Sequence, residues 1–194
     1  MTYSHPPHRR SIRLPGYDYS QPGEYFITLV THHREPLFGD IVDFEMRLNP
    51  LGQMVWQEWN KIPILHPEMD LGEFIVMPNH FHAIIIINDP PVGAIHELPL
   101  PNELPANDPP LPVRAVHEPP LRDDSRRRMK IPMVIGRFKM NTAKRINQIR
   151  DTPGLPVWQR NYYEHIIRSE KEYLQIEAYI ENNPANWVAD NENV

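Results

Sequence analysis

Apolar runs separated by turn residues and prolines predict an α+β fold for this chain. Three segments rich in β-branched and aromatic residues, 24–32, 71–77 and 80–88, are typical of strands. Only two residues connect the last two segments, so we expect them to form an antiparallel hairpin. The isoleucines at 84–87 make an unbroken apolar run, which indicates a strand that is buried on both faces.

Apolar positions spaced three or four residues apart, together with capping residues, predict the helices. We expect them at 49–62, 131–149 and 169–183. Asn49 and Pro50 are typical of an N-cap and a first helical position, and Ser169 with Glu172 forms a capping box. Residues 38–48 and 156–168 predict further strand or hairpin structure. The order of these elements favours a central antiparallel sheet with helices packed on it.

A proline-rich stretch divides the predicted domain. Ten of the 35 residues from Asp89 to Asp123 are proline, and no periodic pattern survives there. We therefore expect one domain over 23–188, interrupted by a disordered insert at 89–124. An N-terminal arm over 1–22 and a short tail over 189–194 complete the expected organisation.

Replacing residues 90–124 by a short Gly/Ser linker should leave the melting temperature within a few degrees of the wild-type value. The stretch has too little apolar side chain to offset the entropy of ordering it. Thermal unfolding of the deletion variant measures the effect. A large loss of stability or solubility would mean that the insert packs on the core.

Composition narrows the class of protein. The chain has no cysteine, which excludes disulfides and thiolate metal sites, and no apolar run is long enough to span a membrane. We expect a cytoplasmic protein. The net charge of −5 disfavours nucleic acid as a partner, but residues 125–150 contain nine Lys and Arg and no acid. Such a basic segment is either a polyanion site or a solvated helix face.

Two histidines stand where the isoleucine-rich strand begins, in the sequence MPNHFHAIIII. His80 and His82 are two residues apart in a strand, so their side chains share one face. Two imidazoles on one face can bind a divalent cation if a third ligand comes from elsewhere. The alternative is a pair of hydrogen-bonded histidines without a ligand.

The last predicted helix carries a candidate partner for the histidines. Tyr173, Ile176 and Ile180 form an apolar stripe that should face the sheet. Tyr179 lies on the flank of this stripe, and Asn183 is one turn further along the same flank. The two side chains either face the histidine pair or are an ordinary boundary tyrosine and a helix cap.

The motif H-x-H, followed by VWQRNYYEHIIR and YLQIEAYIENNPANW, resembles the HUH single-tyrosine transposases, most closely the REP-associated tyrosine transposases. The resemblance runs from about 25 to 187, without the proline-rich insert. It implies a fold of the HUH nuclease or ferredoxin-like type. It also implies an enzyme that cleaves and rejoins single-stranded or hairpin DNA through a 5′-phosphotyrosine. It implies Tyr179 as the nucleophile, and His80, His82 and Asn183 as ligands of Mg²⁺ or Mn²⁺. Monomers and homodimers are both compatible with it.

In this interpretation the basic residues hold the DNA backbone. The candidates are Arg126, Arg127, Arg128, Lys130, Arg137, Lys139, Lys144, Arg145 and Arg160. Trp158, Tyr162 and Tyr163 either stack on unpaired bases or belong to the core. Alternative functions are a hairpin-DNA-binding protein of the same fold that does not cleave, a metal-dependent phosphohydrolase, and an interaction module with a structural metal.

Overall fold

The computed structural model describes residues 21–89 and 129–187. Most of the predicted arm, the insert after Asp89 and the tail lie outside these residues, and so do Arg126, Arg127 and Arg128. Within the described ranges, no helix combines the length and the hydropathy that crossing a membrane requires.

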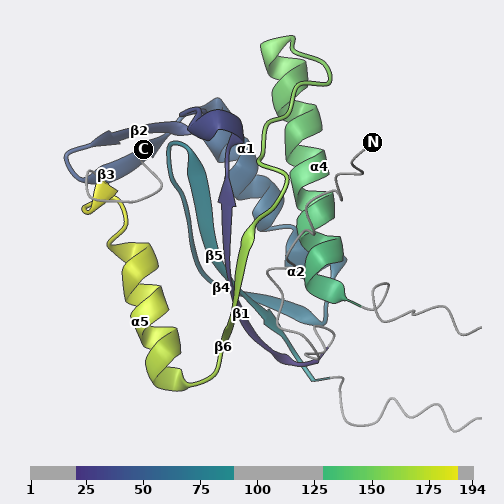
Figure 1. Cartoon of the computed structure of the whole chain (residues 1–194), viewed down its shortest axis with the longest axis vertical. Helices are drawn as coiled ribbons and strands as arrows, with labels where there is room; N and C mark the ends of the chain where they lie inside the picture. Colours follow the sequence, from purple (N-terminus) through teal and green to yellow (C-terminus); the bar gives the residue numbers. More distant parts are fainter. Residues whose placement is uncertain (1–20, 90–128, 188–194) are drawn as a thin grey trace, which may run out of the picture.

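The described elements follow the predicted order (Figure 1). The strands are β1 Gly23–Val30, β2 Gly39–Val42, β3 Glu45–Leu48, β4 Met69–Val76, β5 His80–Ile87 and β6 Tyr163–Ile167. The helices are the 3₁₀ turn η1 His32–Arg34, α1 Pro50–Trp59, α2 Ile62–Leu65, α4 Lys130–Arg150 and α5 Glu170–Glu181.

Among the described residues, four strands form one antiparallel sheet in the order β4-β5-β1-β6. The short strands β2 and β3 pair separately as a hairpin. The expected α+β fold with an antiparallel sheet is therefore confirmed. The predicted hairpin of the second and third segments is also confirmed, because β4 and β5 pair directly.

Helices cover both faces of the sheet (Figure 1). On one face, β5 contributes Phe81 and its alternating apolar neighbours to a large core with α1 and α4. On the other face, Ile84 packs with Ile180 of α5 in a smaller core. A strand between two covered faces can carry apolar residues on both, which accounts for the isoleucine run.

Local sequence signals explain the helix ends. The Oδ1 atom of Asn49 accepts hydrogen bonds from the backbone N–H groups of Leu51 and Gly52, as expected of an N-cap. Ser169 caps α5 in the same way by accepting from the N–H of Glu172. The helix predicted over 49–62 instead ends at Trp59, and α2 follows as a separate turn.

The strand predicted over 156–168 is shorter in the structure. Only residues 163–167 form β6, and Trp158 makes an isolated bridge with Thr31. The Nζ atom of Lys139 donates hydrogen bonds to the carbonyl oxygens of Gln159 and Arg160, at 2.6 and 3.1 Å. These carbonyls bond to α4, and the regular pairing of β6 with β1 begins only at Tyr163.

Two glycines in helices predict opposite responses to alanine. A Cβ on Gly52 would meet the carbonyl oxygen of Phe38 at 2.2 Å, whereas a Cβ on Gly136 meets nothing within 4 Å. Gly52→Ala should lower the free energy of unfolding by about 1–3 kcal/mol through overpacking. Gly136→Ala should raise it by about 0.5–1 kcal/mol because alanine favours the helix. Urea unfolding of both variants measures the difference, and a stabilising Gly52→Ala would contradict this packing.

Candidate active site

The two histidines of the H-x-H motif lie side by side at the start of β5. Their ring centroids are 4.5 Å apart, and both side chains are buried. They occupy the face that α5 covers, while Phe81 between them belongs to the opposite core. The predicted placement of His80 and His82 on one face is therefore confirmed. Their role as metal ligands stays a prediction.

The helix α5 brings a hydroxyl and an amide to this pair. The hydroxyl oxygen of Tyr179 lies 3.2 Å from Nε2 of His82. The Oδ1 atom of Asn183 lies 3.3 Å from Nε2 of His80. Tyr179 is 46% exposed and Asn183 only 2%. A substrate in solvent can therefore contact the Tyr179 side chain, while the Asn183 amide is part of the buried base of the site.

His82 is held in place from the neighbouring strand. Thr28 stands directly opposite His82 in the β1–β5 ladder, and its Oγ1 lies 2.8 Å from Nδ1. The ring of Phe26 stacks on the imidazole at a centroid distance of 5.4 Å. Burial, together with the nearby His80, holds the pKa of His82 well below its usual range. Burial therefore disfavours the protonated imidazole. In the tautomer whose Nδ1–H donates to Thr28, the Nε2 lone pair faces Tyr179 and is available to a cation.

His80 faces an amide oxygen at each ring nitrogen. Its Nδ1 lies 2.9 Å from Oδ1 of Asn79, and its Nε2 faces Oδ1 of Asn183. An amide oxygen only accepts hydrogen bonds, so a neutral imidazole that donates to Asn79 turns a lone pair toward Asn183. A cation held by both Nε2 and Oδ1 would make this contact favourable. The donor set of two imidazoles and an amide oxygen fits a divalent cation of the Mn²⁺ or Mg²⁺ kind.

The basic segment lies away from this site. The helix α4 packs with α1 on the face of the sheet opposite the histidines (Figure 1). Lys139 bonds to backbone carbonyls, and Arg145 forms an ion pair with Glu58 at 3.0 Å. Of the other candidates that the structure describes, Arg137, Lys144 and Arg160 are exposed and Lys130 is half-buried. A role for these residues in DNA binding stays a prediction.

The aromatic candidates beside Arg160 have different environments. Trp158 is 6% exposed, and its Nε1 donates to Oγ1 of Thr142, so it is a core residue and not a stacking platform. Tyr162 packs partly on the core and donates its hydroxyl to Glu164. Tyr163 is 55% exposed.

Sequence reasoning missed the residues that support the histidines. Thr28 is a polar position inside an apolar strand, and Asn79 directly precedes His80, so both carried a weak signal. Trp187 follows α5, and its ring lies 5.8 Å from that of His80. Nothing in the local sequence placed Trp187 beside the histidines, because only the path of the chain after α5 brings it there.

Comparisons with known proteins give one close relative in sequence. An uncharacterized protein of Haemophilus influenzae is 42% identical over 186 residues, which cover 94% of this chain and 92% of that protein. No protein-family model matches the chain.

Two solved structures are similar in fold. A REP-associated tyrosine transposase bound to a REP hairpin has a TM-score of 0.45 at 18% identity, covering 85% of this chain and 68% of that one. A candidate transposase from Deinococcus radiodurans R1 has a TM-score of 0.42 at 17% identity, covering 88% and 95%. Both TM-scores are below 0.5, so the functional argument depends on the residues of this chain.

Proposed function

We propose that this chain, which belongs to the same family as the Haemophilus influenzae protein, cleaves and rejoins single-stranded DNA at hairpins with Tyr179 as the nucleophile. The observation that carries the proposal is the contact between the Tyr179 hydroxyl and Nε2 of His82, 3.2 Å apart. A half-exposed hydroxyl held by a neutral, buried imidazole is the arrangement of an activated nucleophile. The fold and the motif resemblance agree with this reading.

The reaction conserves the energy of the phosphodiester. The Tyr179 oxygen attacks phosphorus, and a bond from that oxygen to phosphorus replaces the bond from phosphorus to the 3′ oxygen of the DNA. The tyrosine proton passes to Nε2 of His82 and from there, directly or through water, to the departing 3′ oxygen, which becomes a free hydroxyl. A 3′-hydroxyl of the same or another strand can then reverse the step and rejoin the DNA.

A divalent cation has a place in this site. His80, His82 and Asn183 would hold it, and it would offset the negative charge that develops on the phosphate oxygens. Nε2 of His82 has a single lone pair, so it serves either the tyrosine proton or a cation at one time. The dependence of the reaction on added cation is therefore part of the test.

Incubation with labelled hairpin oligonucleotides tests the proposal. The probes are palindromic repeats from the host genome with single-stranded flanks, with and without Mg²⁺ or Mn²⁺, analysed on a denaturing gel. A covalent protein–DNA band and a free 3′-end are expected. Retardation on a native gel without a covalent band would instead support a DNA-binding protein that does not cleave. If no probe gives either a covalent band or retardation, both the cleavage hypothesis and the DNA-binding hypothesis are wrong.

A further inference from the structure

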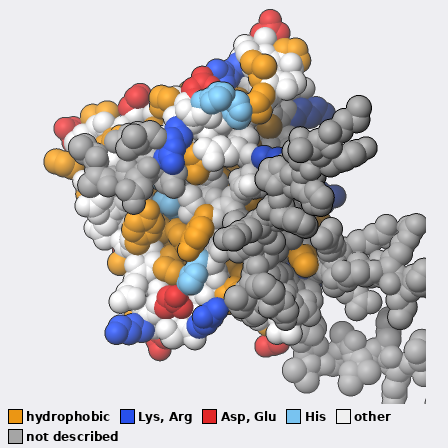
Figure 2. All heavy atoms as spheres, viewed as in Figure 1, with side chains coloured by type: hydrophobic (Ala, Val, Ile, Leu, Met, Phe, Trp, Pro, Cys, Tyr) orange, Lys and Arg blue, Asp and Glu red, His pale blue; other side chains and the backbone are white. Residues whose placement is uncertain are grey.

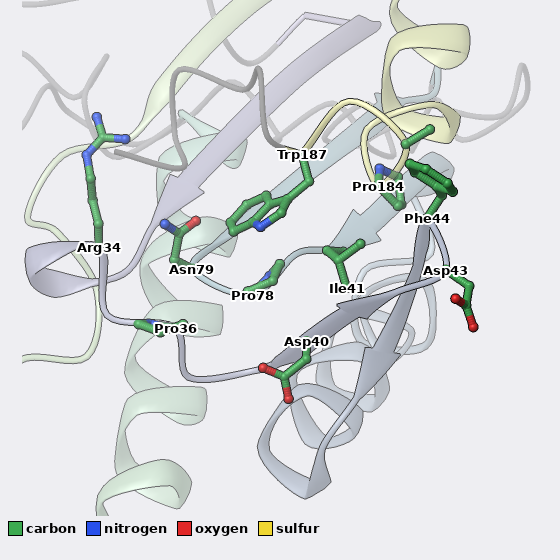
Figure 3. Close-up of a pocket in the computed structure, with 11 residues that line it drawn as sticks. Arg34, Pro36, Asp40, Ile41, Asp43, Phe44, Pro78, Asn79, Pro184 and Trp187 are labelled. Carbon is green, nitrogen blue, oxygen red and sulfur yellow. The ribbon is translucent and has the colours of Figure 1, made fainter.

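A hollow of about 680 Å³ lies beside the candidate active site. The β2–β3 hairpin forms one side of it, and the segment that follows α5 forms the other (Figure 3). Its floor includes Asn79, whose side chain contacts His80. Trp187, the aromatic neighbour of His80, is also part of the wall. A ligand in this hollow therefore lies next to His80, whose ring neighbours that of His82, the histidine that contacts Tyr179.

The tip of the β2–β3 hairpin presents an aromatic side chain to the hollow, and the backbone there is strained. Asp43 and Phe44 connect β2 to β3, and their φ angles are 53° and 64°. A two-residue hairpin turn of this kind usually carries glycine or asparagine, because a bulky residue is strained there. Phe44 is 74% exposed, so packing does not explain its presence. Strain of this sort is typical of functional positions.

The remaining lining residues suit a nucleobase better than a phosphate. In Figure 3 Ile41 lies between Trp187 and Phe44 and Pro78 lies below the Trp187 ring, and both add apolar surface to the hollow. Asp40 also lines the hollow, and its carboxylate repels phosphate but accepts hydrogen bonds from the amino and imino groups of bases. Aromatic side chains beside an apolar surface stack on any base.

Arg34 lies where it could bind the phosphate backbone of a DNA strand in the hollow. It lines this hollow and also a second one of about 690 Å³, whose other residues include His32, His33 and Arg160. Figure 2 likewise shows histidine and basic side chains beside each other on one face of the molecule. A guanidinium between two hollows is placed to hold a phosphate of a strand that passes from one to the other.

We propose that the hollow between the β2–β3 hairpin and Trp187 binds one unpaired nucleobase of the DNA, next to the phosphate that Tyr179 attacks. Phe44 and Trp187 stack on the base, and Arg34 holds the adjacent backbone phosphate. This proposal rests on the proposed function, because it assigns the position of the base relative to the cleaved bond. It also gives the single strand a path at the end of the sheet.

Photocrosslinking tests the position of the base. The probe is a single-stranded oligonucleotide of twenty thymidines in which 5-iododeoxyuridine replaces one thymidine at successive positions, and peptide mapping locates the crosslink. We expect crosslinks at Phe44 or Trp187. Crosslinks confined to α4 or elsewhere would overturn the proposal. This readout needs no cleavage, so it is independent of whether the covalent adduct forms.

Phe44→Gly should change the affinity for the oligonucleotide without destabilising the fold. It should weaken binding of the same oligonucleotide by about 5-fold or more, as expected for the loss of one stacked base. The melting temperature should stay the same or rise, because glycine relieves the positive φ. Phe44→Tyr should restore binding. Trp56→Ala is the matched control, since Trp56 is an exposed aromatic on α1, 47% exposed, and should bind as the wild type does. Unchanged affinity in Phe44→Gly would overturn the proposal.

Discussion

Tyr179→Phe should abolish the covalent protein–DNA adduct while leaving the fold and the affinity for hairpin DNA close to those of the wild type. The substitution removes only the hydroxyl that lies 3.2 Å from Nε2 of His82. Loss of a nucleophile in other enzymes lowers kcat by factors on the order of 10⁶. Denaturing gels of the variant with a labelled hairpin measure the adduct, and native gels measure the affinity.

The other tyrosines near the site are poorly placed for the same role. Burial raises the pKa of the Tyr173 hydroxyl, and the carboxylates of Glu177, Glu24 and Glu73 raise it further. The hydroxyl of Tyr162 donates to Glu164 at 2.7 Å. The Tyr179 hydroxyl, in contrast, lies 3.2 Å from a histidine nitrogen.

Tyr163→Phe is the control for the loss of the adduct. Tyr163 contacts the ring of Phe26, as Tyr179 does, and it is similarly exposed. The adduct should form normally in this variant. If the adduct persists in Tyr179→Phe and disappears in Tyr163→Phe or Tyr162→Phe, the assignment of the nucleophile to Tyr179 of α5 is wrong.

His82→Gln should abolish both the adduct and the binding of Mn²⁺ to the protein without DNA. The substitution removes the Nε2 atom that faces Tyr179 and retains a polar side chain of similar length at a buried position. The proposed cation then keeps one imidazole, and the glutamine amide at position 82 is a weaker ligand for Mn²⁺ than the imidazole it replaces, so specific binding should be lost. Titration with Mn²⁺, followed by electron paramagnetic resonance of the free ion, measures the binding directly.

His66→Gln is the control for cation binding. His66 lies at the end of α2, and its Nδ1 is 3.8 Å from a carboxylate oxygen of Glu68. This variant should bind one Mn²⁺ as the wild type does. Equal binding in wild type, His66→Gln and His82→Gln would show that the histidine pair is not the cation site, whatever happens to the adduct.

Much of the local structure could be predicted because it depends on neighbours in sequence. Asn49 and Ser169 cap their helices as expected, since a cap is formed by hydrogen bonds within one turn. The alternation of β5 put His80 and His82 on one face. The stripe of α5 also holds, because Ile180 is fully buried against the sheet and Ile176 packs there as well. Tyr173 is only half-buried, which the stripe alone did not indicate.

The sequence by itself determined which residues share a face, and only the tertiary structure decided what covers that face. Helical and strand periodicities fix directions relative to one element, so they grouped Tyr179 with Asn183 and His80 with His82. Whether α5 or the basic helix α4 packs over the histidines depends on strand order and on the path of the connections, which no local pattern contains. The order β4-β5-β1-β6 places Thr28 opposite His82, and packing puts α4 on the far face. The sequence therefore identified the chemical groups of the candidate site, while long-range packing assembled them.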